Sequence, residues 1–327
     1  MHILILGGGG MVGRKLAERL ARDGHLGDRE VTQVTLHDVV EPQAAAGARF
    51  KVCTLTSDFA RPGEAERLLA ERPDVIFHLA AIVSGEAEAD FDKGYRINLD
   101  GTRFLFDAVR GLGKGYKPRL VFTSSIAVFG APFPEAIGDD FFTTPLTSYG
   151  TQKAIGELLL ADYTRRGFFD GVGIRLPTIC VRPGKPNKAA SGFFSNIIRE
   201  LLAGQEAVLP VSTKVCHWHA SPRSSVNFLI HAATMDTAAI GPRRNLTMPG
   251  LSVTVAEQIE GLRKVAGERV VARIRREPDA TIERIVTGWP RNFDASRAAG
   301  LGFKAESSFE EIIRIHIEDE LGGRFVK

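Results

Sequence analysis

The chain has 327 residues, of which 44% are hydrophobic and 25% charged, with a formal net charge of +3. This composition is that of a globular protein without low-complexity segments. Lysine and arginine are dispersed, which argues against nucleic-acid binding, and no apolar run approaches the ~18 residues needed to span a membrane.

The cysteines and the first residues both favour a cytoplasmic protein. Cys53, Cys180 and Cys216 are odd in number and lack metal-type spacing, which argues against disulfides and zinc. The sequence enters a predicted strand almost at once, which leaves no room for a signal peptide. We therefore expect a reducing, cytoplasmic compartment.

A glycine-rich turn follows the first predicted strand, residues 2–6, and leads into a helical pattern. Strand, glycine turn and helix together are typical of a dinucleotide fingerprint, in which a pyrophosphate binds at the helix N-terminus. The glycines fit two registers, one starting at Gly7 and one at Gly8, and the spacing leaves both open. The predicted cofactor contacts here are Met11, Val12 and the glycines common to both registers, Gly10 and Gly13, with Gly7 added if the first register holds.

Acidic residues follow the next two predicted strands, residues 31–36 and 50–55. Asp38 lies where a carboxylate accepts from the ribose hydroxyls of an adenosine and repels a 2′-phosphate, so we predict NAD over NADP. Asp58 either hydrogen-bonds an adenine amino group or caps a helix.

The next elements are a helix over residues 62–71, a strand over 74–79 and a long helix over 91–109. Small residues after the strand would let a dinucleotide lie close to the sheet edge. The long helix contains Asn98, and a buried asparagine in mid-helix usually satisfies neighbouring backbone. The predicted cofactor contacts in this region are Leu79, Ala80, Ala81 and Asn98.

A tyrosine and a lysine form the most informative pair. Tyr149 and Lys153 lie four residues apart at the start of a predicted helix, so they share one face. A free tyrosine titrates near ~10, and a neighbouring ammonium favours the phenolate. Ser125, at the end of the strand around residues 120–122, can donate to the oxygen whose proton the tyrosine removes.

Strands alternate with helices up to a sixth predicted strand, residues 172–181, which Pro177 interrupts. This alternation predicts an α/β fold with a doubly wound parallel sheet over residues 1–180. Ligands bind such sheets at the carboxyl ends of the strands, where the glycine turn, Asp38, Asp58, Ala80 and Ser125 all fall.

Residues 181–327 are predicted to form mainly a small substrate-binding cap, with some segments returning to the core. We expect helices at 192–203, 253–265 and 308–318, a strand at 269–274 and irregular structure at 215–219. The two histidines near Cys216 cannot easily converge on one ion, so we predict no metal. Candidate contacts to an anionic or hydroxylated substrate are Arg182, Lys185, His217, His219 and Arg223.

Together these motifs resemble the extended short-chain dehydrogenase/reductases of the NAD-dependent epimerase/dehydratase group. The matching segments, read along the chain, are Gly7-x-x-Gly10-x-x-Gly13, Asp38, Asp58, His78 to Ala81, Asn98 to Thr102, Ser124 to Gly130, Tyr149-x-x-x-Lys153 and Arg175 to Pro177.

The resemblance implies a role for each matched residue and the glycine register that begins at Gly7. Tyr149 would be the acid/base, Lys153 would hold the nicotinamide ribose and lower the pKa of the tyrosine, and Ser125 would orient the substrate oxygen. Pro177 would line the nicotinamide pocket. The substrate contacts we expect are Ser84, Ser125, Tyr149, Arg182 and Arg223.

Two departures from the family pattern weigh against a nucleotide-sugar substrate. Phe129 replaces a tyrosine, and the sequence around Arg223 lacks the usual Arg-Asp-aromatic run. Trp289-Pro290 and residues 300–303 make the chain most similar to dehydrogenases that oxidise a four-carbon sugar acid at C2.

Two other functions stay open, a nucleotide-sugar epimerase or dehydratase and a non-catalytic nucleotide sensor. As in much of this family, we expect a homodimer that pairs the helices at 91–109 and 149–165.

Overall fold

The computed structural model describes residues 1–113, 115–184 and 190–326. A seven-stranded sheet forms its centre, in the order β12-β8-β7-β6-β1-β4-β5, and all its pairings are parallel. The strand order reverses on either side of β1, which confirms the doubly wound arrangement. The strands are β1 (His2–Leu6), β4 (Gln33–Asp38), β5 (Lys51–Thr56), β6 (Val75–His78), β7 (Arg119–Ser125), β8 (Asp170–Leu176) and β12 (Asn245–Thr247).

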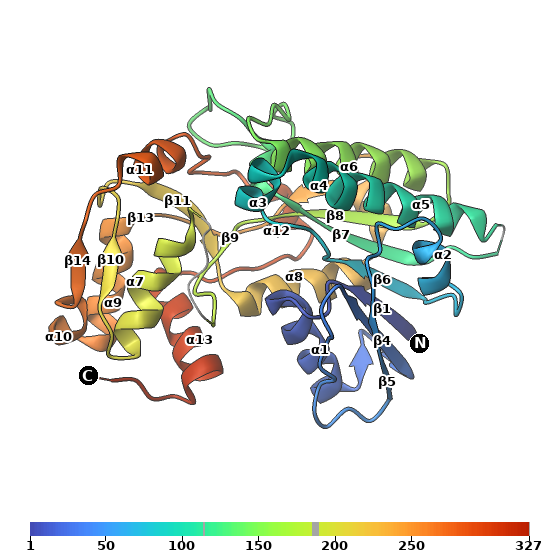
Figure 1. Cartoon of the computed structure of the whole chain (residues 1–327), viewed down its shortest axis with the longest axis horizontal. Coiled ribbons are helices and arrows are strands. Elements are labelled where there is room, and N and C mark those ends of the chain that lie inside the picture. The colour runs from blue at the N-terminus through green and yellow to red at the C-terminus, as the bar shows by residue number, and fades with distance from the viewer. Residues whose placement is uncertain (114, 185–189, 327) are drawn as a thin grey trace.

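Helices cover both faces of this sheet (Figure 1). α1 (Met11–Asp23) and α8 (Pro222–Thr234) pack on one face, while α2 (Glu64–Leu68), α5 (Gly101–Gly111) and α6 (Ser148–Arg165) pack on the other. Successive strand residues point to opposite faces, so Ile3 and Ile5 join one core cluster, and Leu4 and Leu6 join the other. Burial on both faces explains why the strands read as continuous apolar runs.

The long predicted helix is divided where it carries the asparagine. It comprises α4 (Phe91–Gly94), a π-helical segment (Tyr95–Asp100) and α5, and Asn98 lies in the π-helical segment. π-Bulges of this kind are frequent at functional sites. Before it, α3 (Ser84–Ala89) packs against α6, and the small hairpin of β2 (His25–Leu26) and β3 (Arg29–Glu30) follows α1.

A second body gathers most of the chain after residue 180 around its own core (Figure 1). Its small sheet has the order β13-β11-β9, and a parallel pair joins β10 to β14. The elements are β9 (Thr178–Ile179), α7 (Gly192–Leu202), β10 (Ala207–Leu209), β11 (Cys216–Ala220), β13 (Leu251–Thr254), α9 (Val255–Ala266), α10 (Glu268–Val271), β14 (Ile274–Arg276), α11 (Ala280–Thr287) and α13 (Phe309–Leu321).

Two predictions about this second body are wrong. The segment expected to be irregular forms β11, where the buried rings of His217 and His219 find hydrogen-bond partners. Their polarity masks the strand pattern in the sequence. The first half of the strand expected at 269–274 belongs to α10, because Val270 and Val271 are buried in the second core, and tertiary packing overrides their β propensity; β14 begins only at Ile274.

The chain crosses between the two bodies more than once. Pro177 separates β8, in the large sheet, from β9, in the small one. Later, α8 and β12 pack with the large sheet, as does the short helix α12 (Ser296–Gly300) through Ala298. In the described part of the chain, no helix combines the length and apolar character needed to cross a membrane.

Candidate active site

The turn between β1 and α1 can be built only with glycine at two positions. Gly7 has a φ of +90°, and a Cβ there would lie 2.8 Å from the backbone nitrogen of Ala80. A Cβ on Gly13 would lie 2.2 Å from the carbonyl oxygen of Gly7. These close approaches hold β1, α1 and the end of β6 together.

The N-terminus of α1 is suited to an anion. Gly10 is its N-cap and supplies no side-chain cap, and the first turn contains no acidic residue. The N–H groups of Met11, Val12 and Gly13 therefore have no side-chain acceptor at the positive end of the helix dipole. A pyrophosphate fits this cradle because it would satisfy those donors.

Asp38 lies at the carboxyl end of β4, beside the glycine turn. Its carboxylate accepts the backbone N–H of Gly9 at 2.9 Å and that of Val39 at 2.7 Å. These bonds fix the carboxylate and leave further acceptor positions on its two oxygens. The adjacent Val39 is 67% exposed, so the strand tip is open on this side.

Asp58 and Asn98 both make contacts within the protein. Asp58 accepts from the backbone N–H of Ala60 at 3.1 Å and pairs with Arg96 at 2.6 Å. Asn98 is buried and bonds to both backbone groups of Ile82, at 2.9 and 3.2 Å. Asn98 therefore fixes the loop that follows β6, which begins with Leu79, Ala80 and Ala81.

Tyr149 and Ser125 meet at the end of β7. Tyr149 is half-buried near the start of α6, whose N-cap Thr147 accepts from the backbone N–H of Gly150 at 3.1 Å. Burial raises the pKa of Tyr149, while a hydrogen bond with the Ser125 side chain and the charge of Arg182 act to lower it. A phenol held in this way can exchange a proton with a ligand oxygen.

Lys153 is buried one turn along α6. Its ammonium donates to the carbonyl oxygen of Thr123 at 2.8 Å and lies 5.7 Å from the ring centroid of Tyr149. Burial lowers the pKa of Lys153 to about 8, and the carboxylate of Glu157 opposes that shift. Of its three donors, at least one stays available to a ligand hydroxyl.

Arg182 approaches the same phenol from the second body. Its guanidinium donates to the carbonyl of Ile179 at 3.1 Å and to the Ser191 hydroxyl at 2.7 Å. Burial lowers the pKa of Arg182, and the titratable groups that also affect this pKa are Cys180, Tyr149 and Arg199. Within the described ranges no carboxylate pairs with this cation.

The second arginine predicted to bind substrate, Arg223, forms ion pairs with two carboxylates of α13. Arg223 begins α8 and forms ion pairs with Glu318 at 2.9 Å and Asp319 at 2.5 Å. These carboxylates raise the pKa of Arg223 and neutralise it. The structure thus gives Arg223 a bridge from α8 to α13, and its contact with a substrate carboxylate stays a prediction. Lys185 lies outside the described residues.

The two histidines of β11 are buried and make their hydrogen bonds within the second body, and the Nδ1 of His219 has no partner among the described residues. The Nδ1–H of His217 donates to the carbonyl of Pro290, and its Nε2 accepts from Thr178, both at 2.8 Å. Burial lowers the pKa of His217 to about 4 and that of His219 well below its usual range. No group of three or more His, Cys, Asp or Glu side chains able to hold a metal ion occurs among the described residues.

Two further predicted residues lie in or directly after elements that neighbour α6 and β7. Ser84 is the first residue of α3, which is tied to the start of α6 by the Ser148 N–H donating to Glu88 at 2.9 Å. Pro177 directly follows β8, the neighbour of the strand that ends in Ser125.

The carboxylate of Glu157, one turn beyond Lys153 on α6, was not predicted from the sequence. Its spacing of four residues from Lys153 on α6 is the signal that could have found it.

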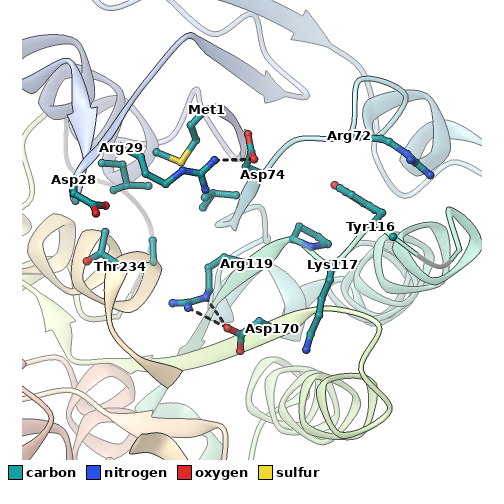
Figure 2. Close-up of a pocket in the computed structure, with 16 residues that line it drawn as sticks. Met1, Asp28, Arg29, Arg72, Asp74, Tyr116, Lys117, Arg119, Asp170 and Thr234 are labelled. Carbon is teal, nitrogen blue, oxygen red and sulfur yellow. Dashed lines mark hydrogen bonds and ion pairs between the residues drawn. The ribbon is translucent and has the colours of Figure 1, made fainter. Parts of the chain in front are cut away.

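A cavity of about 710 Å³ lies at the opposite edge of the sheet (Figure 2). It is bordered by Met1 and by the amino ends of β6, β7 and β8. Two of its arginines are already paired, Arg29 with Asp74 at 2.9 Å and Arg119 with Asp170 at 3.0 Å, and the third, Arg72, donates to the carbonyl of Leu112 at 2.9 Å. Because parallel sheets bind ligands at their carboxyl ends, we assign the active site to the Tyr149 edge.

Comparisons with known proteins agree with this geometry. Residues 3–219 match the NAD dependent epimerase/dehydratase family. The D-erythronate dehydrogenase of Cupriavidus necator is 48% identical over 98% of each chain, and that of Haemophilus influenzae is 41% identical over 98% of this chain and 100% of its own.

Solved structures match over almost the whole length. One described as a nucleoside-diphosphate-sugar epimerase from Agrobacterium tumefaciens is 70% identical, with a TM-score of 0.97 over 99% of this chain and 95% of that one. A GalE-like L-threonine dehydrogenase from Cupriavidus necator shares the fold, at 22% identity and a TM-score of 0.84 over 98% and 99% of the two chains. The family match, the full-length relatives and the Tyr149 edge lead to one conclusion: the chain belongs to the NAD dependent epimerase/dehydratase family.

Proposed function

We propose that the protein is an NAD-dependent dehydrogenase that oxidises D-erythronate at C2 to 2-dehydro-D-erythronate. One observation carries the proposal. Arg182, which has no carboxylate partner among the described residues, acts together with the Ser125 side chain to lower the pKa of Tyr149. A proton acceptor and a free cation in one site suit a hydroxyl adjacent to a carboxylate.

The relatives support the same substrate class. Two proteins named D-erythronate dehydrogenase are 48% and 41% identical over nearly the full chain. Their activity is oxidation of a CH–OH group, which is the chemistry that a tyrosine, a serine and a lysine at the end of β7 can support.

The choice of NAD over NADP rests on Asp38. Its carboxylate is held by the N–H groups of Gly9 and Val39 at the tip of β4. A negative charge in that position favours ribose hydroxyls and opposes a 2′-phosphate. The uncapped start of α1 and the glycine contacts fit a dinucleotide pyrophosphate, which is an observation independent of Asp38.

In the proposed reaction, Arg182 binds the substrate carboxylate and directs the C2 hydroxyl toward Tyr149. The phenolate oxygen of Tyr149 removes the hydroxyl proton, and Ser125 donates to the same substrate oxygen as negative charge develops on it. Lys153 holds the ribose and adds positive charge beside the phenol. When bound, NAD supplies the acceptor for the hydride that leaves C2.

A nucleotide-sugar epimerase is the second candidate, since the structure that is 70% identical carries that description. Such a substrate brings a diphosphate, which needs several cationic or N–H donors. Of the two arginines predicted to bind substrate, Arg223 is neutralised by Glu318 and Asp319, which leaves Arg182. Among the described candidates, a single cation without a carboxylate partner matches one carboxylate better than a diphosphate.

The test is net formation of reduced cofactor from purified enzyme, free NAD or NADP, and a panel of four- to six-carbon sugar acids. We expect the enzyme to turn over D-erythronate with NAD and to do so far more slowly with NADP. The Asp38→Ala variant should show a smaller preference for NAD over NADP. The epimerase would replace the proposal if three results came together. The purified enzyme would carry stoichiometric NAD, form no reduced cofactor with any sugar acid of the panel, and interconvert a nucleotide sugar with its epimer.

A further inference from the structure

We infer that Glu157 is a positioning residue for the proton transfer at Tyr149, acting through Lys153 and through Ser124. This inference rests on the proposed roles of Tyr149 and Lys153. The three residues follow one another at intervals of four along α6, so they lie on one face of the helix and point toward the end of β7.

Glu157 is buried and holds the end of β7 through a side chain. It is 3% exposed, and the Ser124 hydroxyl donates to its Oε1 at 2.5 Å. Ser124 immediately precedes Ser125, whose side chain acts to lower the pKa of Tyr149. The residue before it, Thr123, accepts the Lys153 ammonium. Three consecutive residues at the end of β7, Thr123 to Ser125, thus lie against one face of α6.

Arg175 of β8 pairs with this carboxylate. It donates to Glu157 through Nε at 2.9 Å and Nη2 at 2.8 Å, a bidentate pair between two buried side chains. Arg175 also lies 3.6 Å from Asp139 and 4.8 Å from the ring centroid of Phe129. A second acid and an aromatic face therefore remain with Arg175 if the charge of Glu157 is removed.

Four titratable groups surround Lys153. Tyr149 and Glu157 belong to its own helix, His78 faces it from β6, and Arg175 lies behind Glu157 on β8. Burial lowers the pKa of His78 to about 3, so it stays neutral across the working range. Glu157 is the group that raises the pKa of Lys153 against burial. It therefore keeps the ammonium charged at the pH where the phenolate is needed.

A purely structural ion pair predicts a different behaviour from a positioning role. Loss of a structural pair lowers stability and scales activity by one factor at every pH. Loss of the charge at Glu157 instead removes the support for the Lys153 ammonium. The fall of kcat/KM at high pH then moves to lower pH, and the Tyr149 titration moves to higher pH.

Three variants separate these cases. Glu157→Gln keeps an acceptor for Ser124 but loses the charge, and we expect the descending limb of kcat/KM to move down by about one pH unit. Ser124→Ala keeps the charge of Glu157 and removes the hydrogen bond from Ser124 to Glu157. We expect kcat to fall while the descending limb of kcat/KM stays at the same pH. Arg175→Met removes the opposing cation and should move the limb up, which is the opposite sign.

A substrate-free readout keeps this inference separate from the proposed function. The sequence contains four tyrosines, so the phenolate absorbance of each protein minus its own Tyr149→Phe background reports Tyr149 alone. We expect the Glu157→Gln difference curve to titrate at higher pH than the wild-type curve, whether or not D-erythronate is turned over.

Identical curves and an unmoved limb in Glu157→Gln would overturn the inference. If that variant does not fold, a downward or absent shift in Arg175→Met has the same meaning. Failure of the wild type on sugar acids, with the shifted Tyr149 titration present, would overturn only the substrate.

Discussion

Replacing Arg182 by methionine is expected to remove the carboxylate anchor while keeping the length of the side chain. The guanidinium donates two hydrogen bonds within the protein, to the carbonyl of Ile179 at 3.1 Å and to the Ser191 hydroxyl at 2.7 Å. It has five N–H donors, so several remain for a substrate carboxylate. Methionine fills similar space without charge, and the loss should therefore appear in substrate handling.

The magnitude follows from the burial of Arg182. Truncating one partner of a buried, hydrogen-bonded charge pair costs about 2–5 kcal/mol. Because Arg182 is half-buried, we take about 2–3 kcal/mol, which lowers kcat/KM for D-erythronate by about 30- to 150-fold. Arg182 also acts to lower the pKa of Tyr149, so the rise of activity with pH should move to higher pH in the variant.

The assay measures kcat/KM of the wild type and of Arg182→Met with D-erythronate and with its neutral amide, D-erythronamide. The four values form a cycle equivalent to a double-mutant cycle, in which the second change is made in the substrate. The wild type should prefer the acid by the factor that the variant loses, and the variant should discriminate little between the two. Arg223→Met is the matched control, because it breaks ion pairs with Glu318 and Asp319 and leaves the Tyr149 edge intact. An unchanged kcat/KM in Arg182→Met, with a large loss in Arg223→Met, would refute this reasoning.

Three further changes test separate parts of the account. Tyr149→Phe should lower kcat by about 10²–10⁴-fold with NAD affinity nearly unchanged by fluorescence titration, and retained turnover would remove its role as base. Gly13→Ala should cost about 1–3 kcal/mol in chemical denaturation and weaken NAD binding, because its Cβ would lie 2.2 Å from the Gly7 oxygen; wild-type affinity would contradict the cradle. Leu158 on α6 is 69% exposed, so Leu158→Asp should convert a dimer to a monomer by light scattering, whereas a monomeric wild type would end that idea.

Local rules made the nucleotide-binding half predictable. Gly7 and Gly13 are needed because backbone passes within contact distance, and this need is visible in the sequence as a strand, a glycine turn and a helix. The parallel strands read as apolar runs because both faces are buried. Tyr149 and Lys153 were recognisable because helix periodicity brings them to one face.

The second body was harder to predict because its partners are distant in sequence. Arg223 looked free until α13 brought Glu318 and Asp319 beside it. β11 was not predicted because the polar His217 interrupts its apolar pattern. The His217 ring can be buried because it hydrogen-bonds with Thr178 and Pro290, which are distant in sequence.

The cations that act on the phenol also depend on tertiary structure. Lys153 was predictable from spacing, but its bond to the Thr123 carbonyl requires the sheet to be in place. The charge of Arg182 reaches Tyr149 only because the chain turns back after β9. Charge placement across elements is therefore the part that the sequence pattern left open.

The central claim is that hydride leaves C2 of a sugar acid and stays on the cofactor. The most direct test is incubation of the enzyme with NAD and D-erythronate carrying deuterium at C2, followed by mass analysis of both products. We predict deuterium in the reduced cofactor and a 2-oxo acid without it, in equal amounts. Deuterium that remains in the sugar acid, with no net reduced cofactor formed, would contradict the account.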